Sequence, residues 1–229
     1  GTLVNGPERC VSVNDGLEGC QTINMSFDSS SSVSTDDALT ANGLPAEVIG
    51  VSKDGKRVHV RITPGENVLN SATLFEFKKN DTKIGEEIFR NLNTKYAGEG
   101  TADTSWYDVY KNITNEFVIA TSADLYGFAK AVNSAVNGNS SFANKTVYLV
   151  SDIEANQGYA DKTNLTWNSS LAADGTTAIT GTSYPWTAIA STTSGTNYFS
   201  GTFDGQMHTI SGIYLDTAES YRGLFAGTN

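Results

Sequence analysis

Cationic side chains and long apolar runs are both scarce in this sequence. Of its 229 residues, 15 are Lys or Arg and 25 are Asp or Glu, which gives a formal net charge of -10. Nucleic-acid-binding proteins cluster cations to meet the phosphates, so we expect no nucleic-acid partner. No apolar run approaches the roughly 20 residues of a membrane-spanning helix, and we expect no membrane span in this chain. No stretch of export-signal type opens the sequence, so any such signal is expected to lie outside these residues.

Histidine is also rare, which limits the metal and catalytic sites that the chain could build. The two histidines are His59 and His208. A metal site would require them to meet or to recruit carboxylates, so structural or surface roles are favoured. The Gly-x-Ser-x-Gly motif typical of serine hydrolases is absent from the sequence. We assign no catalytic residue and expect no cofactor other than calcium.

Four acidic residues are candidates for a catalytic or metal-binding set. Paired carboxylates hydrolyse glycosidic bonds, and Asp152, Glu154, Asp161 and Asp204 are the candidates. Asp204 precedes Gly205, where a turn explains it, so hydrolysis is disfavoured. The first three are weak calcium candidates, because calcium prefers carboxylate oxygens. The alternative is that these acids are exposed, solubilising charges.

A break in the hydrophobic pattern divides the chain into two domains. Residues 95–104 are mostly small and Gly residues, without an apolar period. We therefore predict one domain over residues 1–97 and a second over residues 98–229.

The first domain has the alternating pattern of β-strands. Residues 21–27 place three apolar side chains on one face, and Asp54-Gly55 joins two apolar runs as a hairpin turn would. Short strands are also expected at residues 3–4 and 10–13. The total of about seven strands is typical of an immunoglobulin-like (Ig-like) β-sandwich. The Cys-Trp-Cys signature of antibody domains is absent, so this prediction depends on the strand pattern alone.

The second domain opens with a strand and one amphipathic helix. Thr121 and Asp124 have the spacing of a capping box, and apolar residues follow at helical spacing as far as Val136. These signals predict a helix over about 122–137, with Gly138 as its C-cap. A strand is predicted at 146–153, and then a long polar excursion over about 154–197.

Two late segments of the sequence carry a family resemblance. Residues 199–214 read FSGTFDGQMHTISGIY and residues 221–227 read YRGLFAG. They resemble the GLUG repeat at the start of right-handed parallel β-helices in large bacterial surface proteins. The residues that match the motif are Phe199, Gly201, Phe203, Asp204, Gly205, His208, Ile210, Gly223, Leu224 and Phe225. The chain departs from the motif at Met207, where Gly is frequent, and at Ala226.

The resemblance covers roughly residues 104–229 and implies both a fold and a location. The implied fold class is mainly β: the Ig-like sandwich, then the capped N-terminal part of a right-handed parallel β-helix with one amphipathic helix. The motif glycines would relieve crowding at the corners of the coils, and His208 would serve packing or a corner hydrogen bond. Because a solenoid needs at least about three repeats, we expect the full protein to continue beyond Asn229 or this chain to be an excised portion.

An extracellular, bacterial cell-surface location is what the resemblance implies, and one further expectation follows from it. Cys10 and Cys20 are expected to form a disulfide, with two buried thiols as the alternative. Trp167, Tyr184 and Trp186 form a candidate ligand surface, because aromatic residues among Asn and Ser are typical of sugar-binding faces. Core anchoring, above all by Trp186 and Ile189, is the alternative for the aromatic residues of the excursion.

The expected function is adhesion or extracellular scaffolding, without catalysis, through a glycan or host-protein ligand. The alternative is the non-catalytic front part of a carbohydrate-active β-helix enzyme whose active site lies beyond Asn229. A structural protein of a surface layer is a third reading.

Overall fold

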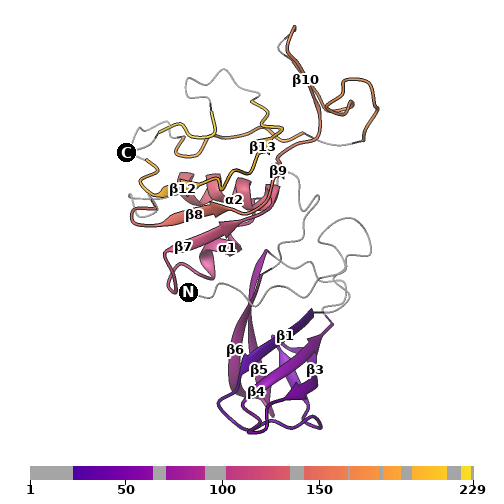
Figure 1. Cartoon of the computed structure of the whole chain (residues 1–229), viewed down its shortest axis with the longest axis vertical. Coiled ribbons are helices and arrows are strands. Elements are labelled where there is room, and N and C mark those ends of the chain that lie inside the picture. Colours follow the sequence, from indigo (N-terminus) through magenta and orange to yellow (C-terminus); the bar gives the residue numbers. More distant parts are fainter. Residues whose placement is uncertain are drawn as a thin grey trace. The chain divides into compact units, whose positions relative to one another are not determined.

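The computed structural model describes residues 23–63, 71–90, 102–134, 142–164, 166–180, 183–191, 198–215 and 223–227. The chain divides into two compact units, residues 1–95 and 96–229, which Figure 1 draws in one view. The described residues are mainly β, as predicted. They include no helix with the length and apolar character needed to cross a membrane. Cys10 and Cys20 lie outside the described residues.

The first unit contains one antiparallel sheet. Its described strands are β1 (Ile23–Asp28), β2 (Leu39–Ala41), β3 (Leu44–Val51), β4 (Arg57–Ile62), β5 (Ala72–Lys79) and β6 (Thr82–Arg90). Their order in the sheet is β1-β4-β3-β2-β5-β6. Every neighbouring pair runs antiparallel.

The edge strands β1 and β6 approach each other, so that the sheet is nearly closed. The amide of Ser30, just after β1, donates to the carbonyl of Ile84 in β6 at 2.7 Å. The ring of Phe27 lies directly against Gly85, where the missing side chain permits the approach. The sequence predicts an Ig-like sandwich, but the described strands form one curled sheet in place of two facing sheets. The strands predicted at 3–4 and 10–13 lie outside the described residues.

Two short hairpins shape this sheet. Asn42-Gly43 joins β2 to β3, and Asn80-Asp81 joins β5 to β6. All four turn residues have positive φ, between 50° and 82°, as two-residue hairpin turns require. In the predicted turn at residues 53–56, it is Gly55 that takes the positive φ, 69°.

The core of the first unit follows the period-two pattern of the sequence. Ile23, Met25 and Phe27 of β1 are buried, and the intervening residues are more exposed. Phe27 stacks on Phe77 of β5, with ring centroids 3.9 Å apart and planes 4° from parallel. The same alternation is present in β4, where Val58, Val60 and Ile62 are buried.

The second unit begins with its two described helices, α1 (Ser105–Asp108) and α2 (Ser122–Asn133). Thr121 caps α2 as predicted, because its Oγ1 accepts from the Asp124 amide at 2.9 Å. In return, the Asp124 carboxylate accepts from the Ala120 amide at 3.0 Å. A capping box would use the amide of the cap residue itself, Thr121, which is one residue later. The helix ends at Asn133, before the predicted residue 137, and its C-cap is Ser134. Gly138 lies outside the described residues.

The strands of the second unit are short. They are β7 (Glu116–Ile119), β8 (Thr146–Leu149), β9 (Ile153–Glu154), β10 (Tyr159–Asp161), β11 (Thr166–Asn168), β12 (Thr202–Asp204) and β13 (Ile210–Ser211). β10 and β11 form an antiparallel hairpin, while β8 lies between β7 and β12 in a parallel sheet.

Parallel pairing between distant segments recurs at two further places. β13 runs parallel beside β9, and Phe225 forms a parallel bridge with Ile189. We call β8, β9 and Ile189 the inner segments, and β12, β13 and Phe225 the outer segments. Each outer segment thus runs beside an inner segment in the same direction. These pairings alone fall short of a complete β-helix.

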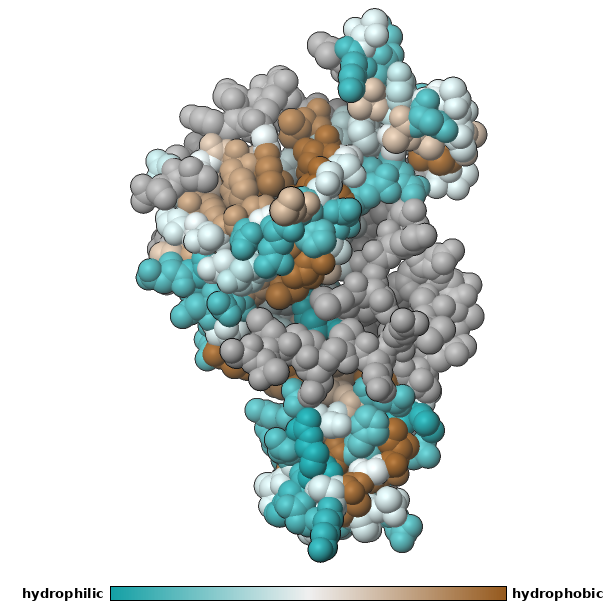
Figure 2. All heavy atoms as spheres, viewed as in Figure 1, coloured by the Kyte–Doolittle hydropathy of each residue, from teal (hydrophilic) through white to brown (hydrophobic). Residues whose placement is uncertain are grey.

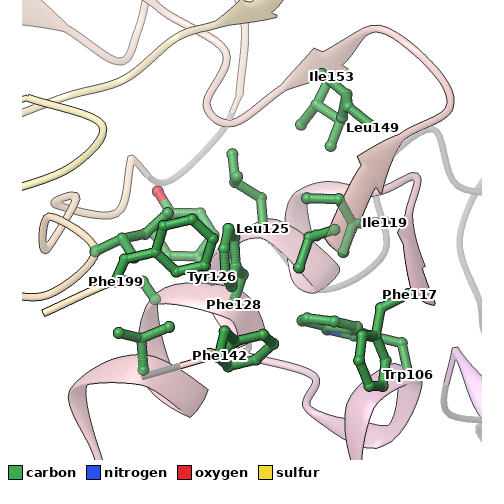
Figure 3. Packing of buried hydrophobic residues seen from close by; sticks show 14 of the residues in the cluster. Trp106, Phe117, Ile119, Leu125, Tyr126, Phe128, Phe142, Leu149, Ile153 and Phe199 are labelled. Carbon is green, nitrogen blue, oxygen red and sulfur yellow. The ribbon is translucent and has the colours of Figure 1, made fainter. Parts of the chain in front are cut away.

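Aromatic side chains form the centre of the second unit's core (Figure 3). Phe128 of α2 packs edge-on against Trp106, Phe142 and Phe199, with ring centroids between 5.3 and 6.0 Å apart. It also packs against Phe203 and Phe225 of the outer segments. The helix therefore fills the space between the strands, and nine of its twelve residues are buried.

The projecting part of the predicted excursion is shorter than 154–197. Glu154 belongs to β9, and Asn156 is buried. The hairpin of β10 and β11 projects from the unit (Figure 1), and we call residues 157–183, which carry these two strands, the arm. Trp186 and Ile189 are again buried, at 4% and 0% exposed, so the predicted anchoring of the excursion by these two residues is confirmed.

Candidate functional site

The apolar residues of the predicted repeat motif line the outer segments. Phe203, Ile210, Leu224 and Phe225 pack against the core of the second unit and are partly buried. Phe199 is buried, at 4% exposed. These apolar motif residues therefore all contact the core of the second unit.

The motif glycines differ in what they do. A Cβ at Gly201 would lie 2.6 Å from the carbonyl oxygen of Phe142, so this position excludes any side chain. Gly205 has nothing within 4 Å of the corresponding point, and the expectation that it relieves crowding is wrong. The left-handed residues of that turn are Gln206 and Met207, with φ of 45° and 65°. Gly223 has φ of 154°, and its carbonyl accepts from the Trp186 indole at 3.1 Å.

Asp152 and His208 meet at the corner between an inner and an outer segment. One oxygen of Asp152 accepts from the Thr209 amide at 2.8 Å and lies 3.2 Å from Nδ1 of His208. The hydrogen bond from the Thr209 amide, and secondly the contact with His208, hold the pKa of Asp152 below its usual value. His208 thus makes a corner contact of the kind that the resemblance implied. His59 belongs to the other unit and lies 2.8 Å from Oγ of Ser26.

The three calcium candidates do not form a cluster. Asp161 accepts hydrogen bonds from the amides of Thr163 and Asn164 within its own turn, and Asp152 is engaged by Thr209. Glu154 is exposed on β9. Within the described ranges, no three His, Cys, Asp or Glu residues are grouped as a metal site requires. Asp204 accepts from the Gln206 amide at 3.0 Å, which is the turn role predicted for it.

The candidate ligand surface separates into buried and accessible parts. Trp186 is 4% exposed and packs edge-on against Tyr126, so its ring is not available to a ligand. Trp167 and Tyr184 are partly exposed. Trp167 stacks on Tyr214 with ring centroids 5.6 Å apart and planes 20° from parallel. The accessible aromatic surface is therefore at the base of the arm.

Asn156 is a buried polar residue that the sequence reasoning missed. Its side-chain nitrogen donates to the Tyr126 hydroxyl at 3.0 Å and to the carbonyls of Tyr184 and Gly212 at 3.1 and 2.9 Å. Its oxygen accepts from the Tyr184 amide at 2.6 Å. One side chain at 2% exposure thus joins α2, the end of the arm and the segment after β13. A single Asn among many in this polar sequence carries no local signal for such a role.

Compared with models of known protein families, with curated proteins and with solved structures, the chain shows no significant match.

Proposed function

We propose that this chain is a non-catalytic module of a bacterial cell-surface protein that acts outside the cell in adhesion or as a scaffold. In this proposal the second unit is the capped start of a right-handed parallel β-helix. The first unit, with its nearly closed antiparallel sheet, is a separate β-module of the same chain.

The observation that carries the proposal is the repeated parallel pairing in the second unit. Phe203 is in register with Val147, and Ile210 is in register with Ile153, 56 to 57 positions apart in the sequence. The motif residues fall on the outer member of each pair. A parallel crossover between neighbouring strands is right-handed in nearly all proteins, which favours a right-handed coil.

A glycan is the ligand class that the arm favours, with a host protein as the second class. Trp167 and Tyr184 are aromatic rings with partial exposure, set among uncharged Thr, Ser and Asn residues. Such rings combine apolar faces with polar edges, as sugar recognition requires. The large negative charge of the chain is no obstacle for a neutral glycan.

A glycan and matrix-protein array tests this proposal with the purified chain and with Trp167→Ala. We expect wild-type binding to at least one ligand and its loss in the variant, without loss of the folded state by circular dichroism. Ile113→Ala, which truncates a 68% exposed apolar residue away from the arm, is the matched control and should bind normally. Absence of binding on the whole array would count against adhesion, and surface labelling of intact cells tests the location separately.

A further inference from the structure

The hairpin between β2 and β3 contains a dipeptide that is chemically reactive in water. In an Asn-Gly pair, the glycine nitrogen attacks the side-chain carbon of the asparagine readily, because glycine has no side chain to obstruct the approach. Asn-Gly occurs at positions 42–43, and also at 5–6 and 137–138, which lie outside the described residues. Asn42 and Gly43 are exposed, on a unit whose visible surface is largely hydrophilic (Figure 2). Water therefore reaches this turn.

The side chain of Asn42 continues the ladder between β2 and β5 past the end of β2. The last residue of β2 is Ala41, whose register partner is Phe77. The Asn42 amide then donates to the carbonyl of Glu76 at 3.1 Å. The Glu76 amide donates in return to Oδ1 of Asn42 at 2.8 Å, so this side-chain oxygen takes the place of a backbone carbonyl.

The nitrogen of the same side chain reaches further along β5. Nδ2 of Asn42 donates to the carbonyl of Leu74 at 2.9 Å. Both ends of the side-chain amide are therefore held by β5. The backbone of the turn is equally defined, because φ is 50° at Asn42 and 82° at Gly43, as a two-residue hairpin turn requires.

These contacts oppose the reaction that the dipeptide favours. The Gly43 nitrogen must approach Cγ of Asn42 from above the plane of the side-chain amide, which requires rotation of Asn42 about its Cα–Cβ and Cα–C bonds. That rotation breaks the hydrogen bonds to Glu76 and Leu74 and distorts the turn. The leaving group of the reaction is Nδ2, the atom that donates to Leu74.

We propose that Asn42 is a deamidation site that the folded sheet keeps closed and that reacts when β2 and its turn separate from β5. In the reaction, a bond forms between the Gly43 nitrogen and Cγ of Asn42. The Cγ–Nδ2 bond breaks, and Nδ2 leaves as ammonia with the proton of the Gly43 amide. Water then opens the resulting succinimide ring at either carbonyl, which gives aspartate or isoaspartate. This inference does not depend on the proposed function.

Neither product restores the closed turn. Aspartate at position 42 has an oxygen where Asn42 has Nδ2, so the Leu74 carbonyl loses this donor and faces a second acceptor. Isoaspartate routes the main chain through the side-chain carbon, which lengthens a two-residue hairpin. Both products weaken the contact between β2 and β5, and the modification is an irreversible record of its opening.

Incubation of the whole chain at mildly alkaline pH, followed by digestion and peptide mass spectrometry, measures the reaction at each Asn-Gly pair. The rate at Asn42 should be at least about tenfold lower in buffer than in concentrated urea, because local opening must precede the attack. The peptides that contain Asn5 and Asn137 calibrate the urea sample, in which all these pairs should react at similar rates.

Leu39→Ala tests the coupling to β2 without altering the turn. Leu39 is 4% exposed in the core of the first unit, so its truncation should loosen β2 and raise the rate at Asn42 in buffer by about tenfold. Leu149→Ala is the matched control, because Leu149 is 1% exposed in the core of the second unit. This variant should leave the rate at Asn42 unchanged. If Leu39→Ala does not fold, Leu39→Val is the milder variant, and a smaller increase is expected.

Three results would overturn the proposal: a rate at Asn42 in buffer as high as in urea, no reaction at Asn42 in either sample, or equal rates in Leu39→Ala and Leu149→Ala. Hydrogen exchange of Asn42→Asp, which reproduces one product, tests the consequence. The amides of β2 should exchange faster in this variant than in wild type, and unchanged exchange would show that the modification leaves the contact with β5 intact.

Discussion

The side chain of Asn156 bonds to both backbone groups of Tyr184, accepting from its amide at 2.6 Å and donating to its carbonyl at 3.1 Å. These two residues flank the arm, so one amide side chain fixes the points where the arm leaves the body and returns to it. We call this pair the clamp. The Asn156 side chain itself is 2% exposed, which makes its hydrogen bonds costly to lose.

Asn156→Ala should therefore destabilise the second unit strongly. The change removes every hydrogen bond of the Asn156 side chain and leaves the partly buried Tyr184 amide and Gly212 carbonyl without this partner, at a cost of about 3 kcal/mol. Urea unfolding measures the loss. Asn168→Ala, which truncates an exposed Asn of the arm, is the control and should change the free energy of unfolding by less than about 0.5 kcal/mol. Equal losses in the two variants would contradict the role of the clamp.

Replacing the arm, residues 157–183, with a short Gly-Ser linker should leave the second unit folded. The clamp holds the two flanking residues together, and the core residues lie outside the arm. The replacement removes the stacking of Trp167 on Tyr214, worth about 1 kcal/mol. Thermal unfolding should stay cooperative, with a modest decrease in Tm. Loss of a cooperative transition would show that the arm is an integral part of the fold.

Local patterns in the sequence predicted the local structure well. The alternation in β1 involves neighbours on one strand, and the Thr121 cap involves two residues three positions apart, so a short stretch of sequence reveals both. The anchoring of Trp186 and Ile189 was also predicted, because large apolar residues in a polar stretch need a core. β2 was missed even though Asn42-Gly43, between Leu39-Thr40-Ala41 and Leu44, is a strong hairpin signal.

Non-local features were not predictable in the same way. Closure of the first sheet depends on contact between β1 and β6, which are far apart in sequence. Residue type alone suggested the calcium candidates, but Asp161 is held within its own turn, Asp152 is held at a corner, and Glu154 is exposed on β9. Asn156 was missed because its partners come from three separate segments.

Thr121→Ala should destabilise the second unit by about 0.5–2 kcal/mol, because the Asp124 amide at the start of α2 loses its acceptor. Chemical denaturation measures the change. Thr121→Ser keeps the hydroxyl and is the matched control, which should recover most of the loss. If Thr121→Ser were as unstable as Thr121→Ala, packing of the Thr121 methyl group and not the cap would explain the effect.

Asp152 should make the stability of the second unit depend on pH in the acid range. Its pKa is lowered in the folded chain, first by the Thr209 amide and then by His208. A carboxyl with a lowered folded pKa stabilises the fold above its unfolded pKa of about 3.9, and this contribution is lost as pH falls through the folded pKa. Wild type should therefore exceed Asp152→Asn in stability at neutral pH, and the difference should narrow below about pH 4.

Urea unfolding of both proteins across this range measures the difference. His208→Gln is the informative companion variant, because it keeps the bond from the Thr209 amide, the larger cause of the lowered pKa. It should retain most of the acid dependence that Asp152→Asn loses. A gap between wild type and Asp152→Asn that stays constant with pH would show that the carboxylate charge contributes nothing at this corner.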